Sequence, residues 1–244
     1  MKTNFKTQFS IAMIAIISML SFSACKKDNV SKYPTAAQFK ALHKAAFDDL
    51  VQSATFNAET GLTFVSDSGA LLVIPPNAFT DNSLPVTGPV DLEFVEIYDS
   101  GNMAACDAPT MGILPDGKRA MLVSGGEFNI AVRKNGKMLT LVLPLDLSVP
   151  VDKSDNGGLP MQLFKDCDCD SDDDGLDKVE GWELVEDGTG HNNVKFIDRQ
   201  DSLSGEFEIY YNTLVNELGW TNIDRFHSDP RPQNYDASES TGRL

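Results

Sequence analysis

The chain has 244 residues, of which 36 are acidic and 20 are basic, and its formal net charge is −16. This excess of negative charge argues against nucleic acid as a partner, because phosphate binding needs a basic face. It also argues against broad adhesion to anionic lipid. Once an N-terminal leader, residues 1–24, is set aside, the remaining length suffices for one domain with its own hydrophobic core or for two small ones.

The leader carries the pattern of an export signal. Lys2 and Lys6 form a positive start, residues 11–20 form an apolar stretch, and Ser23 and Ala24 lead into Cys25. The apolar stretch is too short to stay in a membrane as a spanning helix, and it ends in small residues, as a cleavable signal does. The order Ser-Ala-Cys resembles a lipobox, the processing site of bacterial lipoproteins. An ordinary secretory signal followed by a chance cysteine is the alternative.

The lipobox resemblance implies cleavage before Cys25 and lipid attached to that cysteine. A single acyl chain holds a protein only marginally, so stable anchoring needs more than one, and the lipoproteins that the leader resembles carry three. Lys26 follows Cys25 directly. Lipoproteins that are retained at the inner membrane often carry an aspartate at this position, and this chain lacks it. The resemblance therefore implies a lipid-anchored protein of the cell envelope, at the outer membrane.

Three further cysteines, Cys106, Cys167 and Cys169, follow the leader. Export brings them into a compartment where disulfides persist. Cys167 and Cys169 are too close in sequence to bridge each other comfortably, so we expect Cys106 to pair with one of them and leave one thiol over. Isolated cysteines are the alternative.

Residues 25–54 read as a lipidated tether and one amphipathic helix. Residues 26–34 are polar, and Thr35 with Gln38 forms a capping-box pattern that opens a helix to about Ser53. Its apolar residues recur at helical spacing and make one stripe: Phe39, Leu42, Ala46, Phe47 and Leu50. We expect this helix to pack on the domain or to space it from the membrane.

Short apolar runs broken by Gly, Pro, Asn and Asp follow over residues 55–226 and predict a mainly β domain, an antiparallel β-sandwich. Asn135-Gly136 predicts a hairpin turn. A brief helix is expected over residues 213–218, and residues 227–244 have the composition of a disordered polar tail. The predicted strands are residues 62–65, 70–74, 90–98, 120–123, 127–133, 138–143, 161–164, 182–185, 194–197 and 206–211.

Four stretches of this region carry a resemblance to known families. Residues 66–79 look like the opening of a ZU5-type β-sandwich, in which a strand ends in an Ile-Pro-Pro turn. Residues 86–90, then 124–128 (Ser-Gly-Gly-Glu-Phe) and 218–225 (Leu-Gly-Trp-Thr-Asn-Ile-Asp-Arg), are similar to uncharacterised lipoproteins of Bacteroidetes-type bacteria. The resemblance implies a β-sandwich that serves in protein–protein contacts and supplies no catalytic residues.

The acidic loop 166–180 is the candidate metal site. Its aspartates alternate around Gly175 in the order D-x-D-x-D-G-x-x-D, which resembles a thrombospondin type 3 repeat, and Ca²⁺ prefers many such oxygen ligands. A solvated acidic linker is the alternative. Zinc is not expected, because no histidine and no second cysteine pair lie nearby. The predicted calcium ligands are Asp168, Asp170, Asp172, Asp174, Asp177 and Glu180.

We interpret the chain as a lipid-anchored binding or structural module of the envelope, stabilised by calcium, with a protein or glycan partner and no catalytic activity. One alternative is an envelope hydrolase, because Asp67-Ser68-Gly69-Ala70 matches the Asp-Ser-Gly-Ala of retroviral-type aspartic proteases. The other is a carbohydrate-binding lipoprotein that uses exposed aromatic side chains, although core packing explains these aromatics better. The aromatic candidates are Trp182, Trp220, Tyr210 and Tyr211.

Overall fold

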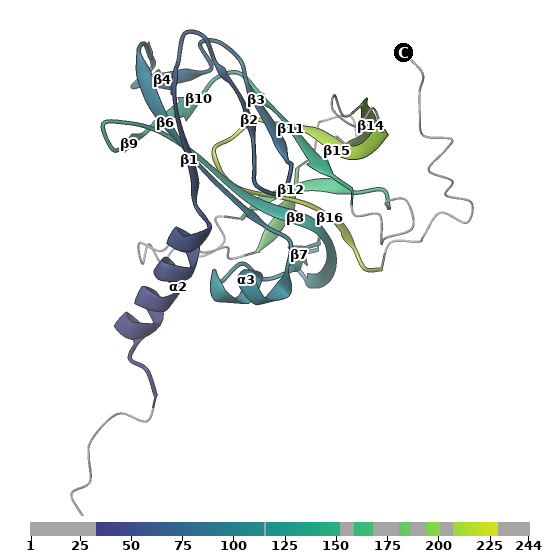
Figure 1. The fold of residues 1–244 in the computed structure, drawn as a ribbon. Coiled ribbons are helices and arrows are strands. Elements are labelled where there is room, and N and C mark those ends of the chain that lie inside the picture. The colour runs from purple at the N-terminus through teal and green to yellow at the C-terminus, as the bar shows by residue number, and fades with distance from the viewer. Residues whose placement is uncertain are drawn as a thin grey trace, which may run out of the picture. The chain divides into compact units, whose positions relative to one another are not determined.

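The computed structural model describes residues 33–114, 116–151, 159–167, 181–185, 194–200 and 207–228. The chain divides into two compact units, Met1–Phe39 and Lys40–Leu244, and the β-strands belong to the second. The prediction of a mainly β fold with an antiparallel sandwich and one preceding helix is confirmed (Figure 1). Among the described helices, none is long and apolar enough to cross a membrane.

Helix α2 (Ala36–Leu50) begins where the capping box predicts. The Thr35 N–H donates to Gln38 Oε1 at 2.9 Å, and the Gln38 N–H donates back to Thr35 Oγ1 at 3.2 Å. The helix ends at Leu50 rather than near Ser53, because Gln52 begins a strand that pairs with a distant part of the chain. Only part of the predicted apolar stripe packs on the domain. Phe47 and Leu50 pack on the domain, whereas Leu42 is 63% exposed.

The described strands of the large sheet follow the order β1-β6-β8-β16-β12-β13-β7, with β9 beside β8. Its longest strand, β8, is paired to β6 on one side and to β16 on the other. The strands are β1 (Gln52–Asn57), β6 (Pro89–Ile97), β7 (Met111–Ile113), β8 (Arg119–Lys134), β9 (Lys137–Met138), β12 (Gln162–Asp166), β13 (Trp182–Leu184) and β16 (Gly219–Phe226).

A second sheet packs on one face of the large sheet and completes the sandwich. Its described strands run in the order β14-β15-β11-β3-β2, and a smaller sheet has the order β10-β4-β5. They are β2 (Leu62–Val65), β3 (Leu71–Ile74), β4 (Phe79–Asp81), β5 (Leu84–Pro85), β10 (Thr140–Leu141), β11 (Leu145–Pro150), β14 (Lys195–Gln200) and β15 (Phe207–Val215). Between the sheets lies the first hydrophobic cluster, in which Phe94, Phe128 and Leu147 are fully buried.

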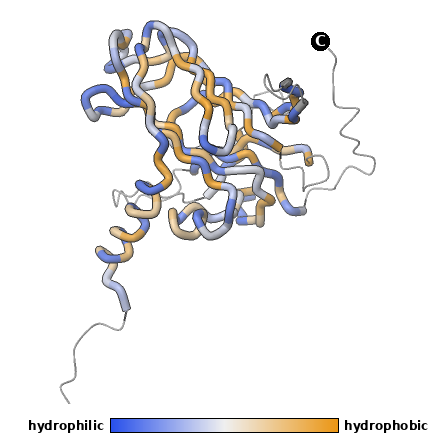
Figure 2. Tube along the Cα trace, viewed as in Figure 1, coloured by the Kyte–Doolittle hydropathy of each residue, from blue (hydrophilic) through white to orange (hydrophobic). Residues whose placement is uncertain are grey.

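A second hydrophobic cluster fills the opposite face of the large sheet. Strand β7 pairs with β8 and, in parallel, with β13, so the sheet closes on itself around this cluster. Trp182 and Phe164 lie inside it, and the short helix α3 (Ser100–Ala105) contributes Met103. Figure 1 shows α3 close to β7, and Figure 2 shows the hydrophobic colour gathered in the strands while the β8–β9 turn is hydrophilic.

Several predicted elements differ in extent. Residues 120–123 and 127–133 were predicted as two strands but form the single strand β8, because Gly125 and Gly126 make a bulge and not a turn. The predicted helix over residues 213–218 is wrong. Thr213, Leu214 and Val215 instead continue β15 and pair with β11. The Asn135-Gly136 turn is confirmed, with φ of 52° and 80° at the two residues. Residues 229–244 of the predicted tail lie outside the described residues.

Candidate functional site

A groove of about 580 Å³ opens beside the ends of β12 and β16, between α2 and the large sheet, all within the second unit. This volume is within the range of sites for small ligands. The residues that line it are Phe47, Glu93, Asn129, Ala131, Arg133, Met138, Leu163, Lys165, Asp166, Leu184, Val185, Val215, Asn216, Glu217, Leu218, Gly219, Trp220 and Thr221.

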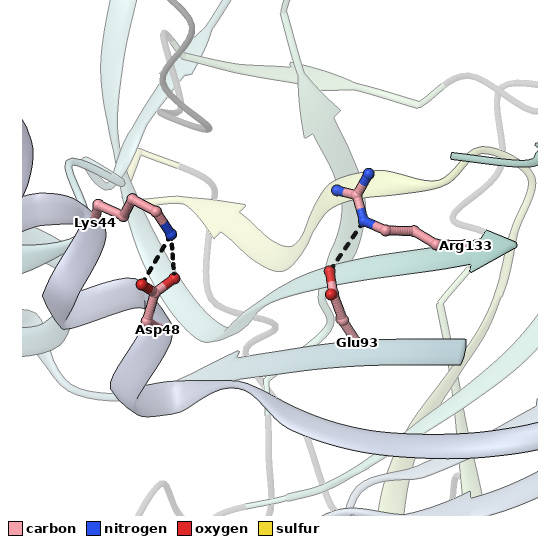
Figure 3. A network of polar contacts seen from close by, with 4 residues as sticks. All are labelled: Lys44, Asp48, Glu93 and Arg133. Atoms are coloured by element: carbon pink, nitrogen blue, oxygen red, sulfur yellow. Dashed lines mark hydrogen bonds and ion pairs between the residues drawn. The ribbon is translucent and has the colours of Figure 1, made fainter. Parts of the chain in front are cut away.

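Four of the five charged side chains in this groove are arranged as two ion pairs, and the fifth is Asp166. Arg133 on β8 donates through Nε to Glu93 Oε2 on the neighbouring β6, at 3.1 Å (Figure 3). Lys165 on β12 lies 3.5 Å from Glu217. Cross-strand pairing holds Arg133 near Glu93, because Asp91 is the register partner of Arg133 and Glu93 follows two residues later on the same face. The groove therefore offers hydrogen-bonding groups whose charges largely compensate one another.

An aromatic wall stands beside these ion pairs. Trp220 packs edge-on against Phe47 of α2, with ring centroids 5.9 Å apart, and against Trp182 at 6.5 Å. Trp182 is fully buried and its Nε1–H donates to the Pro109 carbonyl at 2.9 Å, so it supports the wall from within. The other two predicted aromatics lie on β15 in the second sheet. Tyr211 is buried, and its hydroxyl donates to the Leu159 carbonyl at 3.0 Å.

The four aromatics therefore do not form one sugar-binding face. Tyr210 lies on the second sheet, where its hydroxyl donates to Glu208 and the Arg199 guanidinium lies 5.8 Å from its ring centre. Trp182 and Tyr211 pack in the core, as the preferred interpretation of the aromatics predicts. Only Trp220 contributes to the groove.

The predicted calcium ligands, from Asp168 to Glu180, lie outside the described residues, as does Cys25. The strands on either side of the acidic loop are described. Asp166 at the end of β12 pairs with Trp182 at the start of β13, and the Cys167 N–H donates to the Gly181 carbonyl at 2.8 Å. The acidic loop therefore leaves and rejoins the sheet next to the groove, which Asp166 also lines.

The predicted pairing of Cys106 with Cys167 or Cys169 is wrong. Cys106 is a free, buried thiol in the second hydrophobic cluster, just after α3. Cys167 is disulfide-bonded. Burial among apolar side chains, together with the negative charges of Glu127 and Asp99, raises the pKa of the Cys106 thiol.

Asp67 lies in the hairpin turn between β2 and β3. Gly69 N–H donates to the Ser66 carbonyl at 3.0 Å, and Gly69 has the positive φ of 88° that the turn requires. The Asp67 side chain is exposed, and its own N–H donates to Gln52 Oε1 at 2.8 Å. The Asp-Ser-Gly-Ala sequence thus has a structural explanation as a turn.

A buried carboxylate, Glu96 of β6, anchors this turn. It accepts hydrogen bonds from the Ser66 hydroxyl at 2.7 Å, the Ser68 N–H at 2.9 Å, the Gln52 amide and the Tyr98 hydroxyl. The four donors reach both carboxyl oxygens of Glu96 and tie the turn to β6. Glu96 does not resemble one member of an aspartic-protease pair, in which two carboxyls share a proton.

A second buried acid group joins two of the stretches that carry the family resemblance. Glu127 on β8 is the register partner of Asn222 on β16, and Ser124 is the partner of Asp224. Because partners and their next-but-one neighbours share a face of a sheet, these side chains lie together. Glu127, Asn222 and Asp224 are each 0% exposed.

Two glycines make this arrangement possible. The register shifts by one residue opposite Ile223, where Gly125 and Gly126 form the bulge. A Cβ on Gly125 would lie 2.8 Å from the Ile223 carbonyl oxygen, and Gly126 has a φ of 137°. The extra residue brings Glu127 to the same face as Ser124. Without the bulge, Glu127 would point to the opposite face.

Asp224 accepts several hydrogen bonds in this group, whereas the carboxyl of Glu127 accepts none. Asp224 accepts from the Asn222 amide nitrogen at 2.7 Å, from the Gly125 N–H at 3.2 Å and from the Ser124 hydroxyl. Both carboxyl oxygens of Glu127 and the amide oxygen of Asn222 are buried without a hydrogen-bond partner. Leaving a buried polar group unsatisfied costs about 1–3 kcal/mol, and more if it is charged.

Burial shifts the protonation of both acids. Loss of water raises the pKa of Glu127 to about 9, and the charge of Asp224 adds to this shift. Burial also raises the pKa of Asp224 to about 8, against the lowering effect of its hydrogen bonds to Ser124, Asn222 and Gly125. No lysine, arginine or histidine of the described residues forms an ion pair with either carboxyl.

Within the described ranges, no group of three or more His, Cys, Asp and Glu side chains is placed to hold a metal ion. The Glu127 group combines two acids with an amide and a hydroxyl. The sequence alone did not predict this site, although residues 124–128 and 218–225 both carry the family resemblance. Only the bulge in the structure shows that these two stretches share a face of the sheet. The groove was missed too, since its walls come from strands far apart in sequence.

Comparison with known proteins adds no family. No protein-family model matches the chain, and a search of curated proteins found no match.

Proposed function

We propose that the chain is a lipid-anchored binding module of the cell envelope, without catalytic activity, whose ligand enters the groove beside Trp220. The observation that carries this proposal is the groove itself, a preformed hollow of about 580 Å³ built on a rigid, hydrogen-bonded sheet. Sites that combine an apolar wall with a few fixed polar groups are typical of ligand binding. The predicted lipid on Cys25 would hold this groove at the envelope, at the outer membrane.

The groove favours a neutral ligand rich in hydroxyl groups, such as one or two sugar units of a glycan. Four of its charged groups are compensated in pairs, Arg133 with Glu93 and Lys165 with Glu217, and the fifth is the acidic Asp166, so an anionic ligand would gain little. Such fixed pairs donate and accept hydrogen bonds to hydroxyls in defined directions. Trp220 and Phe47 supply an apolar surface that suits the C–H face of a sugar ring.

The acidic loop gives the module its proposed calcium dependence. Calcium bound by Asp168, Asp170, Asp172, Asp174, Asp177 and Glu180 would neutralise a run of like charges next to the groove. Support comes from the aspartate spacing and from the β12–β13 connection, because Asp166 is both a groove residue and the end of the strand before the loop. Calcium binding would in this way fix the rim of the groove.

The test is binding of the full-length protein, purified in detergent, to an array of neutral oligosaccharides with calcium present. We expect retention of a defined subset, and at least a tenfold loss of affinity when Arg133→Ala and Lys165→Ala are combined, because both polar walls of the groove are then removed. The matched control is Lys195→Ala, an exposed lysine of β14 in the second sheet, which should bind like the unaltered protein. Retention of no oligosaccharide, or equal binding by the double variant, would contradict the proposal.

A further inference from the structure

We propose that Glu127, Asn222 and Asp224, with the hydroxyl of Ser124, form a site for a hard divalent cation of the size of Ca²⁺, separate from the acidic loop. The site lies between β8 and β16 beneath the second hydrophobic cluster. It does not depend on the proposed function, because none of these four residues lines the groove.

Unused acceptors point to a cation. Both oxygens of Glu127 and the amide oxygen of Asn222 are buried without a donor. The Asn222 amide is held over the acid group, since its nitrogen donates to Asp224 Oδ2 at 2.7 Å. Three unsatisfied oxygens on adjacent register positions are ligands that a metal ion could take without displacing any existing hydrogen bond.

The need to balance the charges of Glu127 and Asp224 also indicates a bound cation. Two carboxylates in an apolar environment need either two protons or compensating positive charge. No basic side chain of the described residues pairs with Glu127 or Asp224. One divalent cation neutralises both carboxylates, and the neutral assembly then suits the buried environment formed by Ile97, Leu122 and Trp220.

The ligand atoms decide the class of metal. All of the ligand atoms considered are oxygens from carboxylate, amide and hydroxyl groups, which suit Ca²⁺ with its six to eight oxygen ligands. A zinc-type site would need thiolate or imidazole ligands.

The bulge explains why the site occurs at this point of the sheet. Only the extra residue at Gly125-Gly126 brings Glu127 to the face that carries Ser124, Asn222 and Asp224. The same bulge frees the Gly125 N–H to donate to Asp224 Oδ1 at 3.2 Å, which orients that carboxylate. Bulges often serve to re-aim a side chain next to a functional site.

The test uses the full-length protein in detergent, stripped with EDTA, with Asp170, Asp172 and Asp174 all changed to Asn so that the acidic loop is disabled. Calorimetric titration with CaCl₂ should still show about one ion bound per chain, because the proposed site is intact. Adding Glu127→Gln should weaken this binding at least a hundredfold, since it removes a bidentate carboxylate. Adding Glu183→Gln, a change of an exposed glutamate on β13, should leave binding unchanged.

A second readout covers the case in which Glu127→Gln lowers stability. Tb³⁺, which replaces Ca²⁺ at oxygen sites, should luminesce when the tryptophans are excited, because Trp220 lies on β16 two residues before Asn222. This luminescence should appear in the loop-disabled protein and fall at least tenfold on adding Asp224→Asn. Absence of both calcium binding and sensitised luminescence in the loop-disabled protein would overturn the proposal. So would calcium binding of equal strength after Glu127→Gln.

Discussion

In EDTA, the free energy of unfolding should fall between pH 5 and pH 8, and Glu127 alone should contribute about 4 kcal/mol of this fall, which corresponds to one extra proton on the folded state at about 1.4 kcal/mol per pH unit. The cause is Glu127, whose pKa rises from 4.5 in the unfolded chain to about 9 in the fold. A carboxyl with a raised pKa contributes stability that is fully present below pH 4.5 and is lost as the pH rises through about 9. Asp224, with its pKa raised to about 8, acts in the same direction.

Urea unfolding at a series of pH values measures this slope. Glu127→Gln should reduce the slope by about one proton and leave the part due to Asp224, and it should be more stable than the unaltered protein at pH 8, because the amide need not take up a proton on folding. Glu183→Gln, at an exposed position, should keep the full slope. Added calcium should also flatten it, since a bound cation replaces the protons. Stability that rises steadily from pH 5 to pH 8 in EDTA would contradict the assigned burial of Glu127.

Replacing Phe94 by Ala should lower the free energy of unfolding by about 3–5 kcal/mol, the usual cost of removing a fully buried phenylalanine. Phe94 lies on β6 with 0% exposure, between the two sheets. Its ring centre is 5.5 Å from that of Phe64 on β2 and 6.1 Å from that of Phe128 on β8. The substitution therefore opens a cavity where the second sheet packs on the large one.

Chemical denaturation at fixed pH, followed by tryptophan fluorescence, gives the size of this effect. Met121→Ala is the matched control, because Met121 is also on a strand of the large sheet but is 61% exposed. Its cost should stay within about 0.5 kcal/mol. Equal costs for Phe94 and Met121 would show that the sheets do not pack as described.

Local patterns in the sequence predicted local structure well. The capping box at Thr35 and Gln38 places the start of α2, and Asn135-Gly136 places a hairpin, because both signals act over four residues or fewer. Alternation in residues 62–65 predicts β2 with its observed bounds. Asp99 caps α3 by accepting from the Asn102 N–H at 2.9 Å, a signal that was available but not used.

Elements decided by distant partners could not be predicted. Gln52 and Ser53 were predicted as the end of the helix, but pairing with β6 makes them the start of β1. Thr213–Val215 reads as part of a brief helix, but β11 offers a strand partner and β15 continues. The Gly125-Gly126 pair reads as a turn, since only the facing residue Ile223 shows that the strand carries on through a bulge.

The same limit applies to the candidate sites. The sequence singles out the stretches 124–128 and 218–225, yet their juxtaposition depends on the β8–β16 register. The groove depends on helix α2 and strands β6, β8, β9, β12, β13, β15 and β16 meeting in space. The disulfide prediction failed because Cys106 lies just after α3 as a free thiol buried in the second cluster. The β-sandwich is confirmed, whereas the resemblance to the ZU5 family stays a prediction.

Export and lipid attachment on Cys25 would set the compartment in which the groove and the cation sites act. The decisive measurement is the mass of the N-terminal peptide of the protein isolated from the membrane fraction of the cells that make it. We predict a peptide that starts at Cys25 and carries the added mass of three acyl chains, with Cys25→Ser abolishing the modification. A protein that keeps residues 1–24, or a mature chain that carries no lipid on Cys25, would contradict the account.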